Sequence, residues 1–215
     1  MTQIKHHLTD ALLMAYSAGS LPEAFNLTVA THISLCDECR ARLGAFDAVG
    51  GALLEQAAVP MAKDGLAATM ALIRAGGETT RERPAPRNTG VLPAPLRDYI
   101  GGDLEAVRWR PIGMGVKQAI LPTSKDATAR LLYIPAGAAV PDHGHRGTEL
   151  TLVLQGAFLD ETARFGPGDI EVANEEMDHM PVADIGADCI CLAATDAPLR
   201  FRALMPRLAQ PFLRI

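Results

Sequence analysis

The first 75 residues place hydrophobic side chains at intervals of three and four, which is the spacing of one face of a helix. The pattern stops at Gly19 and Ser20, and Pro22 suits the first turn of a new helix. Two glycines at positions 76 and 77 end the last helical stretch. We therefore predict four helices, over residues 4–17, 22 to about 43, about 46 to 59 and about 64 to 75.

Beyond residue 95 the pattern changes to short hydrophobic runs separated by proline and glycine, which is typical of strands. We predict strands over residues 130–134, 149–155, 169–172 and 188–193. Four prolines between residues 78 and 95 indicate an extended linker. The chain is therefore predicted to be multi-domain α + β: an all-α domain over 1–80, a Pro-rich linker over 81–97, an all-β sandwich or barrel over 98–200, and a C-terminal tail over 201–215.

Composition and charge narrow the class of protein. Hydrophobic residues make up 48% of the chain and charged residues 21%, which is typical of a globular protein. The net charge of −5 argues against direct nucleic-acid binding. No stretch approaches the roughly 20 apolar residues of a membrane span, and the N-terminus is polar, so we expect a cytoplasmic protein. In that reducing compartment, four cysteines are better interpreted as metal ligands or reactive thiols than as disulfides.

Three potential metal ligands in the second predicted helix, His32, Cys36 and Cys39, follow the pattern H-x3-C-x2-C. At roughly 100 degrees per residue they lie at 0, about 40 and about −20 degrees, so they share one face. Two thiolates and an imidazole suit tetrahedral zinc, which needs a fourth ligand. A helical hairpin would bring His6 and His7 alongside; we favour His7, with His6 as the substitute. The alternative is that both cysteines are small buried hydrophobic residues.

The first 75 residues resemble the zinc-binding anti-sigma domain, whose mark is this helix preceded by a histidine on an earlier helix. The matching residues are His7, His32, Cys36 and Cys39. The resemblance implies that the helices wrap around a group IV (extracytoplasmic-function) sigma factor and cover the surfaces it needs for RNA polymerase. In a domain of this size we expect the zinc to be structural first.

A second set of ligands lies in the predicted β domain, where the chain fits G-x5-H-x-H-x3-E-x6-G at Gly137, His143, His145, Glu149 and Gly156. Two histidines at i and i+2 in an extended chain face the same side, and the following loop returns the glutamate toward them. Such ligands hold zinc, iron, manganese, nickel or copper. This pattern resembles the first motif of the cupin family, and it implies a cupin barrel.

The third cupin histidine is expected on a later strand, and His179 is the candidate. It lies further from the turn at residues 166–169 than the common pattern has it, and Ala183 replaces an asparagine that often follows. The alternative is a vestigial site that has lost its metal. Cys189 and Cys191 share one face of a predicted strand, either as two buried core thiols or as an oxidant-sensitive pair near the metal.

From His7 to Cys191 the chain resembles the ChrR family of transcriptional regulators, in which an anti-sigma domain precedes a cupin domain. The resemblance implies a 1:1 complex with a group IV sigma factor, no enzymatic activity, and a response to singlet oxygen or related oxidants through the cupin domain. The alternative function is a metal-dependent cupin enzyme of the dioxygenase or isomerase type. Metal identity discriminates between them: a dioxygenase holds iron(II) with exchangeable positions, whereas we expect zinc in both sites here.

Overall fold

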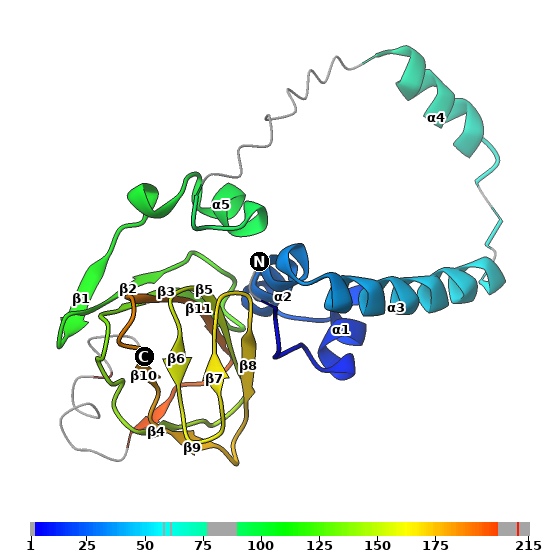
Figure 1. Ribbon diagram of the computed structural model, residues 1–215. Helices are drawn as coiled ribbons and strands as arrows, with labels where there is room; N and C mark the ends of the chain where they lie inside the picture. Colours follow the sequence, from blue (N-terminus) through cyan, green and yellow to red (C-terminus); the bar gives the residue numbers. More distant parts are fainter. Residues whose placement is uncertain (1–2, 58, 61, 77–89, 202–209, 211–215) are drawn as a thin grey trace.

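The computed structural model describes residues 3–57, 59–60, 62–76, 90–201 and 210. Over these residues an N-terminal helical region precedes a C-terminal β-barrel, which confirms the predicted fold class (Figure 1). Among the helices of the described ranges, none combines the length and the apolar character of a membrane span.

The helical elements are α1 (Asp10–Ser17), α2 (Glu23–Leu35), α3 (Asp37–Gln56), α4 (Gly65–Arg74), α5 (Ala94–Ile100) and a short 3-10 helix, η1 (Leu104–Ala106). The fourth predicted helix is confirmed as α4. Helix α5 was not predicted, and it begins inside the predicted linker. The rest of that linker up to residue 89 lies outside the described residues, as does the predicted tail beyond residue 201 except for Gln210.

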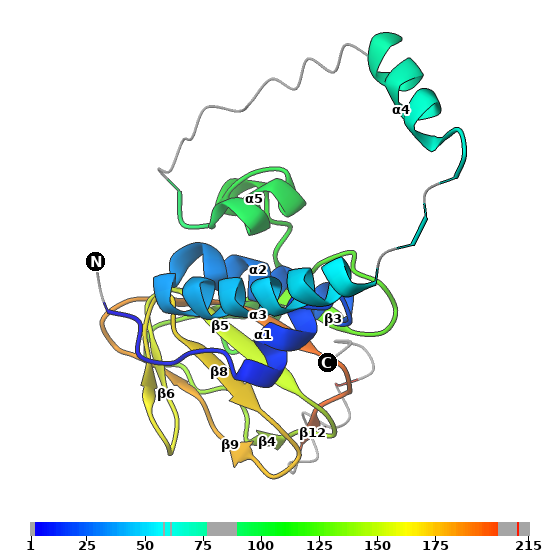
Figure 2. The same ribbon diagram turned by 90° about the vertical axis from the view of Figure 1, so that its right-hand side faces the viewer.

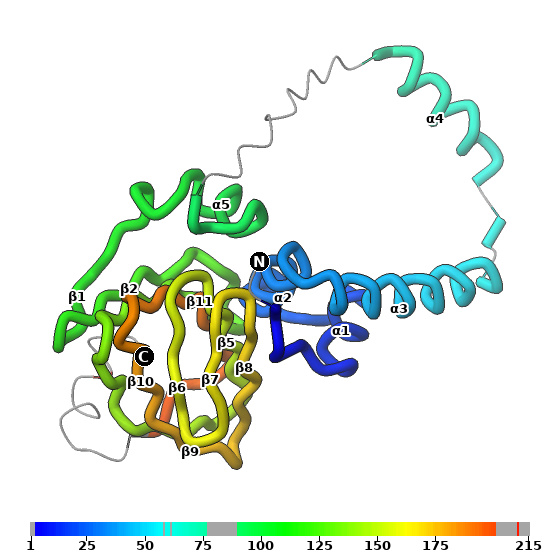
Figure 3. Tube along the Cα trace, in the orientation of Figure 1, coloured from blue at the N-terminus to red at the C-terminus, as the bar shows by residue number. Residues whose placement is uncertain are grey.

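Three details of the helix prediction were wrong. Residues 4–9 are not helical, because Thr9 caps α1 by accepting a hydrogen bond from the N–H of Leu12. The second helix does not run to about residue 43 but ends at Leu35, where Cys36 adopts an extended conformation (φ −107°, ψ 106°). No break follows near residue 45, so α3 continues through the predicted third helix as one 20-residue element, the long rod in Figure 3.

The strands are β1 (Arg110–Gly113), β2 (Val116–Ile120), β3 (Thr128–Ile134), β4 (His143–Gly144), β5 (Glu149–Gln155), β6 (Phe158–Leu159), β7 (Arg164–Phe165), β8 (Ile170–Ala173), β9 (Asp178–His179), β10 (Val182–Ala183), β11 (Cys189–Thr195) and β12 (Arg200–Phe201). The four predicted strands are confirmed as β3, β5, β8 and β11, with shifts of at most two residues at their ends.

The strands form a six-stranded antiparallel sheet in the order β1-β2-β3-β11-β5-β8, closed by two three-stranded sheets, β10-β6-β7 and β12-β4-β9. In the large sheet, β11 lies between β3 and β5, and all of its residues except Thr195 are buried. A strand that is apolar on both faces needs a cover on each side. One face of β11 lines the barrel interior, and the other packs against the helices.

The helical region and the barrel share one hydrophobic core. Figures 1 and 2 show α2 against the large sheet, with α1 and α3 packed on α2 and on each other. Side chains of the helical region, including Leu8, Leu13 and Val29, belong to the same buried cluster as Leu150 and Leu192 of the barrel. Polar contacts accompany this packing: Glu23 of α2 accepts hydrogen bonds from the Tyr99 hydroxyl at 2.9 Å and from the Ser124 N–H at 2.6 Å.

The end of α3 and the whole of α4 present apolar side chains to solvent. None of the described residues of α4 is buried, and Figure 1 shows this helix standing apart from the rest of the fold. The large hydrophobic side chains that are more than half exposed on these two helices are Val49, Leu53, Leu54, Leu66, Leu72 and Ile73. An apolar surface of this kind marks an interaction site.

Candidate metal centres

The four predicted N-terminal ligands lie together. One ligand atom from each of His7, His32, Cys36 and Cys39 lies within 4.8 Å of the others. The Nε2 of His32 is 3.3 Å from the Sγ of Cys39, and the Nδ1 of His7 is 3.3 Å from the Sγ of Cys36. A tetrahedral zinc with bonds of about 2.3 Å to sulfur and 2.0–2.1 Å to nitrogen would separate these atoms by roughly 3.5 Å. The cluster therefore fits one tetrahedral ion.

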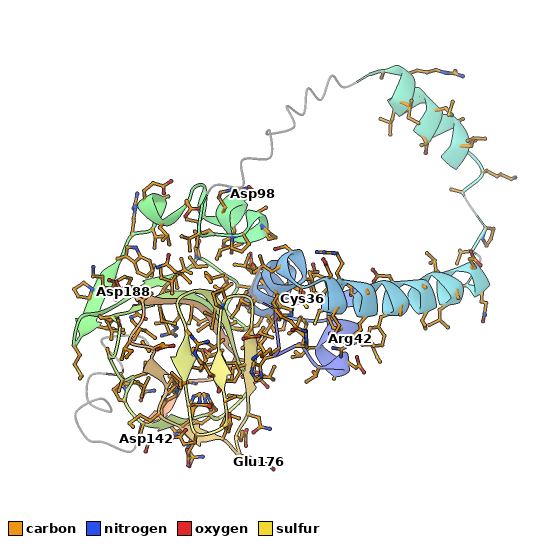
Figure 4. All side chains as sticks on the ribbon, viewed as in Figure 1. Cys36, Arg42, Asp98, Asp142, Glu176 and Asp188 are labelled. Carbon is orange, nitrogen blue, oxygen red and sulfur yellow. The ribbon has the colours of Figure 1, made fainter. Side chains whose placement is uncertain are left out.

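Cys36 reaches this N-terminal centre because α2 ends at Leu35 and the backbone is extended at Cys36. It is the N-cap of α3, and its Sγ accepts a hydrogen bond from the N–H of Cys39 at 3.4 Å. Burial raises the pKa of Cys39 to about 11, so without a cation its thiol stays protonated. A bound metal ion reverses that preference, which fits the donor set. Figure 4 labels Cys36 beside the barrel.

His7 and His6 have different surroundings. His7 points to the cysteines through Nδ1, and its Nε2 lies 3.3 Å from the Oε2 of Glu38. His6 instead packs against Phe165 of the barrel, with ring centroids 4.3 Å apart. Of the two histidines considered as the fourth ligand, the structure therefore brings His7 to the cluster. Its place in an extended segment, rather than on α1, is what lets it reach the two cysteines.

His32 is fully buried on α2. Burial lowers its pKa to about 4, and its Nδ1 has no hydrogen-bond partner among the described residues. The imidazole is therefore neutral at physiological pH, which is the form that binds a metal ion.

Three histidines converge inside the barrel. His143 and His179 lie on the paired strands β4 and β9, and His145 follows β4. The Nε2 of His179 is 3.2 Å from that of His143 and 3.3 Å from that of His145. Three nitrogens bound to one ion at about 2.0–2.1 Å in a tetrahedron are separated by roughly 3.3 Å. The histidine predicted from the weaker motif, His179, therefore takes its place beside the other two.

Each ring of this barrel triad has an acceptor near its other nitrogen. The Nδ1 of His143 lies 2.9 Å from the carbonyl oxygen of Pro141, and that of His179 lies 3.1 Å from the Oε1 of Glu171. The Nδ1 of His145 lies 3.4 Å from the Oε2 of Glu149. For His143 and His179 such contacts fix the tautomer so that Nε2 is free to bind metal, whereas the Nδ1 of His145 makes no hydrogen bond at its distance from Glu149. The triad is thus oriented for coordination from one side.

Glu149 was predicted as the fourth barrel ligand, and it lies at the start of β5, as expected. It is not part of the group within 4.8 Å, because its carboxylate faces the Nδ1 of His145 rather than the Nε2 atoms. Burial opposes its ionisation, but the adjacent ring of His145 and the charges of His143 and His145 outweigh it and lower its pKa to about 2. It is thus a buried carboxylate beside the triad, and its coordination to metal stays a prediction.

Two further acidic residues touch the triad and were not predicted. Glu171 on β8 and Asp160 form a third potential metal group with His179. Burial raises the pKa of Glu171 to about 6, whereas a hydrogen bond from Glu171 helps to lower that of Asp160 to about 2, against the effect of burial. The pair therefore holds one proton below about pH 6 and loses it as the pH rises above that value. The sequence does contain a signal for Glu171, because it is a charged residue between apolar residues of a predicted strand.

A cavity of about 510 Å³ opens over the barrel triad. Its walls are mostly apolar, with Val116, Leu132, Ile134 and Phe158 among the lining residues, and His143 and His179 lie at its surface. A volume of this size holds a small molecule. The barrel centre is therefore open to a ligand on one side, because the side chains of the described residues leave this space unfilled.

The two remaining cysteines lie on β11, as predicted, on one face. Both are buried, and their Sγ atoms are 3.4 Å apart. The pKa of Cys191 is raised well above its usual range by the hydrogen bond with Cys189 and by burial. Cys191 also lines the cavity next to the triad. The structure thus places the pair near the barrel centre, and the oxidant sensitivity of these thiols stays a prediction.

Comparisons with known proteins agree with both halves of the chain. Residues 98–197 match the family model of the ChrR cupin-like domain. The anti-sigma-E factor ChrR of Cereibacter sphaeroides is 63% identical over 213 residues, which cover 99% of both chains. The crystal structure of Rhodobacter sphaeroides SigE in complex with the anti-sigma ChrR matches with a TM-score of 0.79 and 62% identity, over 90% of this chain and 100% of that chain.

Proposed function

The chain belongs to the ChrR family of anti-sigma factors, and from this premise we propose that it binds and inhibits a group IV sigma factor in the cytoplasm, in a 1:1 complex. The observation that carries the proposal is the near full-length similarity to a relative that is crystallised with its sigma factor. Because the similarity extends over both domains, it supports a regulator rather than the cupin enzyme considered as the alternative.

The helical region supplies the inhibitory surface in this proposal. The apolar side chains that α3 and α4 expose offer a surface that a sigma factor would cover. The N-terminal centre lies at the base of α3 and joins the segment before α1 to α2 and α3. Zinc held by His7, His32, Cys36 and Cys39 would fix the relative positions of these helices and contribute folding free energy directly.

The barrel supplies the response to stress. Zinc held by His143, His145, His179 and Glu149 would complete its centre, and the cavity gives a small molecule or a reactive oxygen species access to the site. A signal there acts on the sigma factor only if it stabilises the bound and the released states differently. The common core of the helical region and the barrel provides a physical route for that difference.

The test is co-expression with a group IV sigma factor from the same organism, followed by affinity purification, metal analysis and transcription in vitro. We expect a 1:1 complex, two zinc ions per chain, and inhibition of sigma-dependent transcription. A double substitution, Leu53→Asp with Leu72→Asp, should abolish the complex because it places charge on the apolar surface. Ile185→Asp is the matched control, since Ile185 is 87% exposed on the barrel. A stable chain that fails to bind any such sigma factor would contradict the proposal.

A further inference from the structure

One turn of the barrel contacts the segment that carries His7, a proposed ligand of the N-terminal centre. The turn between β7 and β8, residues 166–169, contains Asp169, whose carboxylate is almost fully buried. Its Oδ1 accepts hydrogen bonds from the backbone N–H groups of Lys5 at 2.6 Å and His6 at 2.9 Å. Its Oδ2 accepts a hydrogen bond from the N–H of Gly166 at 2.8 Å, which holds the carboxylate in place.

The contact continues on both sides of this carboxylate. The N–H of Ile170, the first residue of β8, donates to the carbonyl oxygen of His6 at 3.3 Å. Gly168 has a φ of +89°, and a Cβ on it would lie 2.6 Å from the side chain of Ile4. The turn therefore contacts both the backbone and a side chain of the segment that leads into His7.

We propose that the β7–β8 turn of the barrel, through Asp169, positions His7, so that the metal affinity of the N-terminal centre depends on the barrel. His7 lies directly after two residues whose N–H groups the Asp169 carboxylate holds, and no helix fixes it. Outer contacts of this kind typically change metal affinity by about 10–100-fold when removed. Asp169 is a positioning residue, since it touches no ligand atom itself.

Strand β8, which begins directly after Asp169, leads to the barrel centre. Glu171, two residues after Asp169, contacts the ring of His179 at 3.1 Å. A shift of β8 caused by a change at the barrel triad would thus move the group that holds the His7 segment. The inference rests on the proposed zinc at the N-terminal centre and deepens the proposed regulation, but it does not depend on the sigma factor.

The experiment uses the full-length chain loaded with cobalt. The absorption band from thiolate to cobalt reports the N-terminal centre, because the proposed barrel ligands contain no sulfur. The rate at which this band disappears after addition of a chelator measures how firmly that centre holds its metal. Circular dichroism checks that each variant is folded, and binding of the sigma factor is measured separately.

We expect Asp169→Ala to speed the loss of the band at least about tenfold, and Asp169→Asn, which keeps one acceptor oxygen, to speed it by an intermediate factor. Asp103→Ala is the matched control. Its carboxylate also accepts hydrogen bonds from three backbone N–H groups, those of Val91, Leu92 and Leu104, but has none with residues 4–7. That variant should lose cobalt at the wild-type rate.

Wild-type rates in folded Asp169→Ala would overturn the inference, and so would equal acceleration in Asp103→Ala. If Asp169→Ala does not fold, Asp169→Ser, whose shorter side chain cannot reach the N–H groups of Lys5 and His6, replaces it, and a wild-type rate in that variant overturns the inference. Failure of the wild-type chain to form the band would remove the proposed N-terminal zinc and this inference together. Loss of sigma binding with a normal band would instead count against the proposed function alone.

Discussion

The two candidate metal centres of this chain are built in opposite ways. The N-terminal centre combines His7, from the segment before α1, and His32, from α2, with two thiols from the start of α3. The barrel centre gathers three histidines, and an apolar cavity of about 510 Å³ opens over them. Four protein ligands close a zinc site and make it structural, whereas the cavity gives a small molecule access to the barrel triad. The contrast fits the proposed roles, stability for the first centre and the response for the second.

The largest effect should follow removal of a sulfur ligand. Cys39→Ala is expected to lower the zinc content by one ion per chain and to weaken sigma binding by about a thousandfold or more, because structural zinc supplies folding free energy of the order of 10–16 kcal/mol. Metal analysis and affinity measurement on the full chain check this. Retention of both zinc ions and of tight binding would show that the N-terminal centre is not structural.

Low pH should lower the free energy of unfolding through His32 of the N-terminal centre. The pKa of His32 is about 4 in the folded chain against 6.5 for an ordinary histidine, so the unfolded chain binds more protons between these values. Its contribution to stability is complete above about pH 6.5 and is lost as the pH falls toward 4, by roughly 3 kcal/mol for the metal-free chain. Urea unfolding with chelator present, at several pH values, measures the loss. His32→Gln should remove this part of the pH dependence, and an unchanged slope in that variant would contradict it.

Substitution at the barrel centre should leave inhibition nearly intact. His143→Ala and Glu149→Ala are expected to change basal sigma activity by less than about twofold and to reduce induction by singlet oxygen about tenfold or more, since the open centre serves the response. A reporter for sigma activity, with and without the oxidant, measures both quantities. Full induction with the barrel metal confirmed absent would show that the response does not need that centre.

The smallest effect is expected for an interdomain contact remote from both centres. Tyr99→Phe removes the hydroxyl that bonds to Glu23 and to the carbonyl oxygen of Pro122. A hydrogen bond of this type contributes about 1 kcal/mol. Unfolding in urea should show a loss of that size, with zinc retention and induction unchanged. A change in either would mean that domain docking as a whole, and not the two centres, governs the response.

The sequence predicted most of the side chains in the two clusters but not the path of the backbone between them. Ligand spacing identified His32, Cys36, Cys39, His143 and His145, because that spacing follows from the geometry of coordination. It did not choose between His6 and His7, and His179 departs from the common spacing. The helix break at Cys36 was missed, since helical periodicity carries through H-x3-C-x2-C whether or not one residue turns extended. The role of Cys36 as an N-cap is a local preference that the hydrophobic pattern does not record.

The contacts between the two domains were also not predicted from the sequence. Nothing near residue 169 indicates that its carboxylate accepts hydrogen bonds from Lys5 and His6, which lie more than 160 residues away. Such partners are set by how two folded units dock, and a single sequence contains no signal for that docking. Glu171 differs, because an acidic residue within a buried strand already suggests a special role.

The exposed apolar side chains of α3 and α4 also bear on how long the free protein lasts in a cell. Without its partner the chain presents Leu53, Leu72 and Ile73 to proteases and chaperones, which act on uncovered apolar segments. Covering them in a complex protects the chain by mass action. We therefore expect the uncomplexed inhibitor to turn over faster than the complexed one, so that its abundance follows that of the sigma factor. Once release occurs, rapid clearance would prevent recapture and make the switch hard to reverse until new inhibitor is synthesised.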